Sequence, residues 1–267
     1  MIPGFKAIRI LCALPVFLAA ISCVSAQAQN PSPPSRDRVY LRDIEGIWIN
    51  EQYVKALAQL RSPHAAAKKT PPVVIAIKRD GRAFPIVVTD FDKASVQTVL
   101  DVEPDAKPGS YRLVVGAGDR PMTSREVKYV YFQGSRNAQG RFERLRFAEI
   151  FLMKGRWADY ILLPGEIGPY LNRLVLAGRY KDEQGRDWEF GESGEARWPD
   201  HKFAYELSLN DPGAGCEYLQ TEDLKQGADN KRFGYAWKNG KLSIFPARMA
   251  NKKVRCDARP LAVLTPQ

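Results

Sequence analysis

The side chains that most often carry out catalysis are scarce in this chain, which has 2 histidines in 267 residues. His64 lies in the stretch RSPHAAAKK and His201 in WPDHKF, and neither has a second histidine at a metal-ligand spacing such as His-x-x-x-His. Asp200 precedes His201, but adjacent side chains rarely face each other as a catalytic pair must. The pattern indicates a solvated turn histidine at His201 rather than an acid–base site, and neither histidine is placed to bind a metal.

The glycine-containing segments also lack catalytic spacing. GESGEA does not contain the Gly-x-Ser-x-Gly of a hydrolase nucleophile elbow, and GAGDRP lacks the lysine and hydroxyl residue that complete a phosphate loop. The sequence therefore predicts a non-enzymatic protein with no cofactor and no metal.

The first 28 residues have the pattern of a secretory signal peptide. Lys6 and Arg9 precede the apolar run ILCALPVFLAAI, which is too short to span a bilayer as a stable helix. Small residues then permit cleavage after Ala26 or Ala28. We expect a cleaved signal at 1–28 and a periplasmic or secreted protein without a transmembrane segment.

Cleavage would leave only two cysteines, Cys216 and Cys256. Two cysteines in an oxidising compartment usually form a disulfide bond, which we predict here. A zinc site is the alternative, but two thiols without a nearby histidine make an incomplete set of ligands.

The positive charge is concentrated in the first half of the chain. The net charge is +7 over residues 36–165 and +1 over residues 166–267. Such a field favours an anionic envelope component as partner, or it simply keeps the surface soluble. The densest basic segment, ARMANKKVRCDAR at 247–259, contains no aromatic residue for stacking on bases, which disfavours nucleic acid. Two interpretations of this segment stay open: a solvated loop beside the cysteine, or a contact with an anionic surface.

The folded region has an all-β pattern. After a proline-rich, polar leader at 29–39, which we expect to be disordered, strand-like runs recur every eight to twelve residues or so between Gly, Pro, Asn and Asp. KFAYELSLN alternates cleanly, with Phe203, Tyr205 and Leu207 on one face. Many short antiparallel strands close into barrels or sandwiches, since open edges invite aggregation.

Two hairpins are predicted residue by residue, around Asn239-Gly240 and around Asp80-Gly81, as two-residue turns between alternating runs. The expected cross-strand pairs are Lys238 with Lys241 and Tyr235 with Ile244 in one, and Arg79 with Arg82, Ile77 with Phe84 and Ile75 with Ile86 in the other. We also expect helices at Glu51–Leu60, with Tyr53, Leu57 and Leu60 on one face, and at Ile167–Leu174.

The two halves share a short motif at the start of a strand. IEGIWIN carries Gly46 and Trp48, and LAGRYKD carries Gly178 and Tyr180. In a closed barrel, glycine permits close backbone approach and an aromatic ring can plug the floor. We therefore predict two tandem antiparallel β-barrel domains at 40–165 and 166–267, with one or two short helices.

The Gly-x-Trp motif resembles the first strand of the calycin superfamily, the lipocalins and fatty-acid-binding proteins. A helix after that strand is nearer the fatty-acid-binding arrangement. The resemblance covers Ile44–Leu163 and again Ala177–Leu264, and it implies a barrel around an apolar cavity for a small hydrophobic ligand or lipid.

Aromatic residues of the first half are the candidate pocket lining, and the alternative is that they form an ordinary core. Glu149 shares strand parity with these residues and would point into the cavity unless a bulge turns it outward. The candidate ligand-binding residues are Trp48, Tyr131, Phe147, Glu149, Phe151, Trp157 and Tyr160.

The sequence thus favours an exported binding protein for a small hydrophobic or amphipathic ligand or an envelope component. The alternative is a solid-barrel interaction module, such as an envelope scaffold or inhibitor, that binds a protein or an anionic surface.

Overall fold

Two closed, eight-stranded antiparallel barrels form the fold, accompanied by three short α-helices in the part of the chain that can be described, which confirms the predicted fold class. The computed structural model describes residues 39–68, 73–81, 83–89, 94–116, 128–148, 157–209, 215–222, 231–251 and 253–267. The predicted signal at 1–28 and nearly all of the leader lie outside these ranges.

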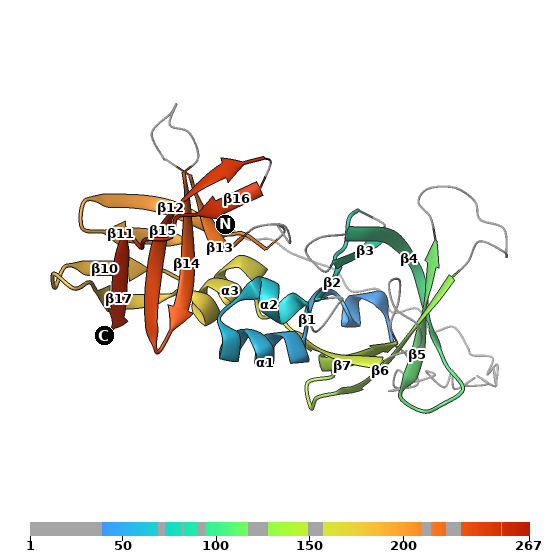
Figure 1. Cartoon of the computed structure of the whole chain (residues 1–267). Helices are drawn as coiled ribbons and strands as arrows, with labels where there is room; N and C mark the ends of the chain where they lie inside the picture. Colours follow the sequence, from blue (N-terminus) through green and yellow to red (C-terminus); the bar gives the residue numbers. More distant parts are fainter. Residues whose placement is uncertain are drawn as a thin grey trace, which may run out of the picture. The chain divides into compact units, whose positions relative to one another are not determined.

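The first barrel is a meander in which each strand pairs with the next in sequence (Figure 1). It closes where Ile49 of the first strand pairs with Ile161 of the last. Its strands are β1 (Gly46–Asn50), β2 (Val74–Ile77), β3 (Phe84–Thr89), β4 (Ala94–Pro104), β5 (Ser110–Gly116), β6 (Lys128–Arg136), β7 (Phe142–Ala148) and β8 (Trp157–Leu162).

The second barrel closes differently, because β15 pairs with both β14 and β17, and β17 returns to β9. A ninth strand, β16, pairs only with β15 and extends the sheet beyond the closed ring. The strands are β9 (Gly178–Lys181), β10 (Asp187–Phe190), β11 (Glu195–Trp198), β12 (His201–Leu207), β13 (Glu217–Glu222), β14 (Arg232–Lys238), β15 (Lys241–Ala250), β16 (Lys253–Cys256) and β17 (Ala262–Pro266).

The helices follow the predicted patterns. In α1 (Glu51–Leu60) the side chain of Asn50 caps the N-terminus by accepting from two backbone N–H groups. Tyr53 and Leu57 are buried, whereas Leu60 is 40% exposed. The remaining helices are a 3₁₀ turn, η1 (Leu41–Asp43), α2 (Pro63–Ala67) and α3 (Ile167–Val175).

The buried face of α1 packs in one hydrophobic cluster with side chains of α3 and of the second barrel. Tyr53 and Leu57 share this cluster with Leu171 of α3 and Tyr235 of β14. The helix after the Gly-x-Trp strand therefore covers more than the barrel that it follows.

The hairpin at Asn239-Gly240 is confirmed. Both turn residues have positive φ, 52° and 73°, as a type I′ turn requires. Lys238 pairs with Lys241 and Tyr235 with Ile244.

The predicted register of the other hairpin is wrong. Asp80 pairs with Ala83, so Gly81 is the first residue of the turn rather than the second. Ile77 consequently lies opposite Ile86, and Ile75 opposite Val88. A shift of two residues keeps every side chain on the same face, so the alternation that supported the expected register fits the observed one equally well.

Both barrels begin with the same local geometry. Gly46 and Gly178 have φ of 150° and 153°, a region that disfavours side chains. Two residues later, the Trp48 Nε1–H donates to the carbonyl of Ile44 (2.9 Å) and the Tyr180 hydroxyl donates to the carbonyl of Leu176 (2.6 Å). Each aromatic side chain is buried and bonds back to the residue four positions earlier.

The predicted disulfide bond between Cys216 and Cys256 is confirmed, with Cα atoms 6.2 Å apart. It joins the residue before β13 to the end of β16, two strands that do not pair with each other. A Cβ at Gly234 on β14 would overlap the Cys256 sulfur, so the glycine makes room for the bond.

Candidate functional site

A cavity of about 370 Å³ lies at one end of the second barrel. Its lining comes from the β9–β10 and β11–β12 turns, the ends of β13 and β14 that meet there, and Leu261 before β17. Because β9 starts at Gly178 and runs toward the first of these turns, the cavity lies at the end opposite the Gly-x-aromatic motif. The lining residues are Arg186, Trp188, Trp198, Pro199, Asp200, His201, Lys202, Phe203, Thr221, Lys231, Phe233 and Leu261.

Trp198 is the centre of the aromatic wall. Its ring centroid lies 4.6 Å from that of Trp188, 4.8 Å from that of Phe203 and 4.6 Å from that of Phe233. Its buried indole N–H has no hydrogen-bond acceptor among the described residues. Most of the wall is thus apolar and supplied by large flat side chains, as is usual for small-molecule sites.

These rings continue a column that starts at the other end of the barrel. Tyr180 contacts Phe190 (5.9 Å between centroids), and Phe190 contacts both Tyr205 (5.6 Å) and Trp198 (6.3 Å). Alternation along the strands turns every second residue inward, which is why β10 and β12 each contribute two rings to one interior. Packed rings fill the barrel toward Tyr180, and the free space remains at the far end.

Cationic side chains surround the cavity. Arg186, Lys202 and Lys231 line it together with His201 and Asp200. Lys202 has a weak ion pair with Glu195, 3.7 Å between charged atoms, and both side chains are more than half exposed. The arrangement combines an aromatic wall with a basic mouth.

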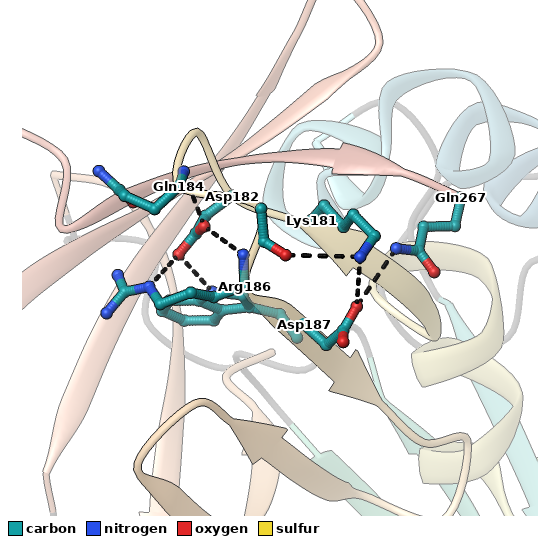
Figure 2. Close-up of polar contacts among 8 residues, drawn as sticks. Lys181, Asp182, Gln184, Arg186, Asp187 and Gln267 are labelled. Carbon is teal, nitrogen blue, oxygen red and sulfur yellow. Dashed lines mark hydrogen bonds and ion pairs between the residues drawn. The ribbon is translucent and has the colours of Figure 1, made fainter.

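A buried carboxylate holds one side of this mouth in place (Figure 2). Asp182, whose side chain is 1% exposed, accepts hydrogen bonds from the backbone N–H groups of Gln184 (3.0 Å) and Arg186 (2.9 Å). It also accepts from Arg186 Nε (2.8 Å) and from Trp188 Nε1 (3.0 Å). Asp182 therefore fixes the orientation of one cation and one ring of the cavity.

The protonation of Asp182 follows from these bonds. Burial alone raises the pKa of the carboxyl, but hydrogen bonds from Arg186, Trp188 and Gln184 outweigh that effect and lower the pKa of Asp182 to about 2. The carboxylate is thus ionised at neutral pH, as a fixed acceptor for the guanidinium and the indole.

Three of the residues predicted to bind a ligand lie inside the first barrel. Trp48, Phe147 and Tyr160 are each at most 1% exposed. Phe147 contacts Tyr160 edge-on (5.6 Å) and Phe132 (5.7 Å). These rings pack against one another in the barrel core.

The other predicted residues lie elsewhere. Tyr131 and Trp157 are 39% and 40% exposed. Tyr131 lies on β6 between Val130 and Phe132, which are both buried, so Tyr131 belongs to the outer face of the sheet. Glu149 and Phe151 fall outside the described residues, and their prediction stays untested.

The sequence did not predict the cavity of the second barrel. The available signal was the density of aromatic residues in DWEF, EARW and HKFAYEL, three short runs separated by tight turns. The alternation along these strands predicts that Trp188, Trp198 and Phe203 face the barrel interior. It does not predict that a cavity remains at one end of that interior.

His64 pairs with Glu217 (Nδ1 to Oε2, 3.0 Å), which also accepts from Ser62 Oγ, so this histidine holds α2 against β13. In the described ranges, no three His, Cys, Asp or Glu side chains gather as a metal would require. None of the helices described is long and apolar enough to cross a membrane.

Comparisons with protein-family models, with curated proteins and with solved structures find no match to this chain.

Proposed function

We propose that this protein is an exported, non-enzymatic binding protein for a small amphipathic ligand, which it holds at the open end of the second barrel. The ligand's apolar part lies against Trp188, Trp198 and Phe233, and its polar part faces the basic mouth.

One observation carries the proposal: a cavity of about 370 Å³ with an aromatic wall and three cationic side chains. Sites for small molecules have volumes of roughly 300–1,000 Å³, are mostly apolar, and contain a few polar groups that orient the ligand. The Asp182 network adds rigidity, because it holds Arg186 and Trp188 before any ligand binds.

Further support comes from the sequence. The Gly-x-aromatic motif resembles that of calycins, whose barrels hold hydrophobic molecules, and both motifs here begin closed eight-stranded barrels. Export is supported by the apolar run behind Lys6 and Arg9 and by the disulfide bond, which persists in oxidising compartments.

The test is binding of a hydrophobic fluorescent probe to the purified protein and to Trp198→Ala. Removal of the central ring should weaken binding at least about tenfold, the equivalent of about 1.4 kcal/mol. Trp157→Ala, which removes an exposed indole of the first barrel, is the matched control and should bind like the parent. Equal binding by parent and Trp198→Ala would contradict the proposal, as would failure of the parent to bind any amphiphile.

The alternative function is an interaction module, and the outer face of the first barrel favours it. Tyr129, Tyr131 and Trp157 are each 39–46% exposed. Arg112 lies 4.7 Å from the ring centroid of Tyr129, and Arg146 lies 5.9 Å from that of Trp157. Exposed aromatic and arginine side chains are typical of protein-binding surfaces. If this function holds, Trp157→Ala should lose a protein partner from the cell envelope while probe binding is retained.

A further inference from the structure

The hairpin of β15 and β16 carries a concentrated positive charge beside the cavity. Ala247 pairs with Arg232 of β14, next to Lys231 of the cavity lining, and the hairpin continues from there past the end of β14. From Ala247 to Cys256 the sequence contains no acidic residue. The hairpin therefore extends the sheet past the end of β14 at which Lys231 lines the cavity. Figure 1 shows β16 beside the end of β15.

The cations of this hairpin share one face. Arg248 lies directly opposite Arg255, and Ala250 lies opposite Lys253. Val254, between Lys253 and Arg255, is 1% exposed, so its two neighbours point away from the core. Arg248, Lys253 and Arg255 are all exposed on that outer face.

This placement is electrostatically unfavourable by itself. Like charges directly opposite on neighbouring strands destabilise a sheet. In the described part of the chain, no acidic side chain forms an ion pair with Arg248, Lys253 or Arg255. An external anion that bridges the two arginines would remove the repulsion.

Two apolar side chains are exposed at this end of the barrel. Met249 lies opposite Val254, and therefore on the other face of the hairpin from Arg248 and Arg255, and it is 49% exposed. Leu261, which lines the cavity, is 53% exposed. Basic residues beside exposed apolar side chains suit a lipid surface, where the cations meet anionic headgroups and the apolar groups enter the interface. A nucleic acid would instead be expected to stack on aromatic rings, which the hairpin does not carry.

We propose that the β15–β16 hairpin docks this protein on an anionic lipid surface, with Arg248, Lys253 and Arg255 as the contacts to headgroups. Docking through this hairpin brings the open end of the second barrel to the lipid. The inference stands apart from ligand binding, because its contacts with headgroups are the three cations of the hairpin and not the aromatic wall of the cavity.

The experiment measures binding of the purified protein to vesicles of phosphatidylcholine alone and of phosphatidylcholine mixed with phosphatidylglycerol. The parent should bind only the anionic vesicles. The double variant Arg248→Thr, Arg255→Thr should bind them about 25-fold more weakly, roughly fivefold for each cation removed. Raising the salt from about 0.1 M to about 1 M, which shortens the Debye length from about 10 Å to about 3 Å, should release the parent.

The same barrel provides a matched control. Lys238 and Lys241 also lie opposite each other, at the turn between β14 and β15 at the other end of the barrel. Lys238→Thr, Lys241→Thr removes the same charge and should change vesicle binding less than about threefold, since these lysines lie beyond the reach of the docked surface.

Three outcomes would overturn the inference. Equal losses in the two double variants would mean that only net charge matters. Equal binding to neutral vesicles would mean that the cations do not act on headgroups. Binding to soluble heparin without binding to anionic vesicles would assign the hairpin to a polyanionic glycan instead. Trp198→Ala, which alters the cavity, should leave vesicle binding unchanged, so that a failure of ligand binding and a failure of docking can be told apart.

Discussion

The two barrels begin alike and end differently. In each, a glycine with positive φ precedes a buried aromatic side chain that bonds back to a carbonyl four residues earlier. The first barrel then inserts α1 and α2 between β1 and β2, and closes by pairing its first strand with its last. The second joins β9 directly to β10 through the Asp182 turn, and β16, which pairs with β15 and extends the sheet beyond the ring, precedes its closing strand β17.

The difference shows how one starting motif can support two interiors. Phe132, Phe147 and Tyr160 pack together in the first barrel, next to Trp48 in the same buried cluster. In the second, packed rings lie toward Tyr180 and a cavity remains at the opposite end. Similar local geometry at the start of two barrels therefore does not decide how their described aromatic side chains are arranged inside.

The largest expected effect concerns the two floor residues. Trp48→Ala should lower the free energy of unfolding by about 3–5 kcal/mol, since it empties a fully buried site. Tyr180→Phe, which removes only the hydrogen bond to Leu176, should cost about 0.5–1.5 kcal/mol. Chemical denaturation measures both. A Trp48→Ala variant within about 0.5 kcal/mol of the parent would contradict the structural role of the Trp48 ring at the barrel floor.

The disulfide bond is the next largest difference between the barrels in the described chain. Replacing both Cys216 and Cys256 by serine should cost about 4 kcal/mol on the chain-entropy model, given their sequence separation of 40 residues. The loss should appear as a lower midpoint of thermal unfolding, and reduction of the parent should reproduce it. An unchanged midpoint after reduction would mean that strand pairing alone holds the second barrel closed.

Alanine substitutions at Gly46 and Gly178 should distinguish the cost of backbone strain from the cost of a steric overlap. Alanine at Gly46 or Gly178 must adopt a positive φ, which costs of order 1–3 kcal/mol. At Gly46 the new Cβ also overlaps the side chain of Leu162, whereas at Gly178 its nearest neighbour is the Tyr180 hydroxyl at 3.2 Å. We expect Gly46→Ala to be the more destabilising in urea unfolding.

Gly165→Ala is the control for the glycine variants. No atom lies within 4 Å of a Cβ built at Gly165, so its stability should stay within about 0.5 kcal/mol of the parent. Equal costs at Gly46 and Gly178 would mean that strain alone accounts for both, and that Leu162 moves aside.

The smallest expected effect is a change in the pH dependence of stability at acid pH, which comes from Asp182. The pKa of Asp182 in the folded protein, about 2, lies below the ordinary aspartate value, so this carboxylate stabilises the fold above about pH 4 and loses that contribution as the pH falls through about 2. Asp182→Asn should be less stable than the parent at neutral pH, with a smaller difference at pH near 2. Thermal unfolding across this range measures it.

A neighbouring carboxylate tests whether the acid effect is specific. Asp187 is 80% exposed and pairs with Lys181 (3.1 Å), so Asp187→Asn should follow the parent's pH profile. A flattened profile in Asp187→Asn rather than in Asp182→Asn would reassign the acid sensitivity.

Much of the fold could be predicted from local pattern. The alternation of Phe203, Tyr205 and Leu207 specified an inward face, and Asn239-Gly240 specified a turn and its register, because both depend on neighbouring residues alone. The Gly-x-aromatic repeats indicated two barrels for the same reason. The disulfide bond was predicted on another ground, because only two cysteines remain after the predicted signal and two cysteines in an oxidising compartment usually pair.

The candidate site could not be located in this way. In the run YVYF both faces of β6 carry bulky residues, so only closure of the sheet placed Tyr131 outside and Phe132 inside. The register around Asp80-Gly81 was ambiguous because a shift of two residues leaves the facing unchanged.

What the sequence determined by itself was the class of fold, the chain order of its strands and the residues able to turn inward, since these follow from backbone preference and period. The tertiary structure alone decided where the cavity of the second barrel lies and which side chains line it. That outcome depends on how side chains from several strands share one interior volume, and no single segment encodes it.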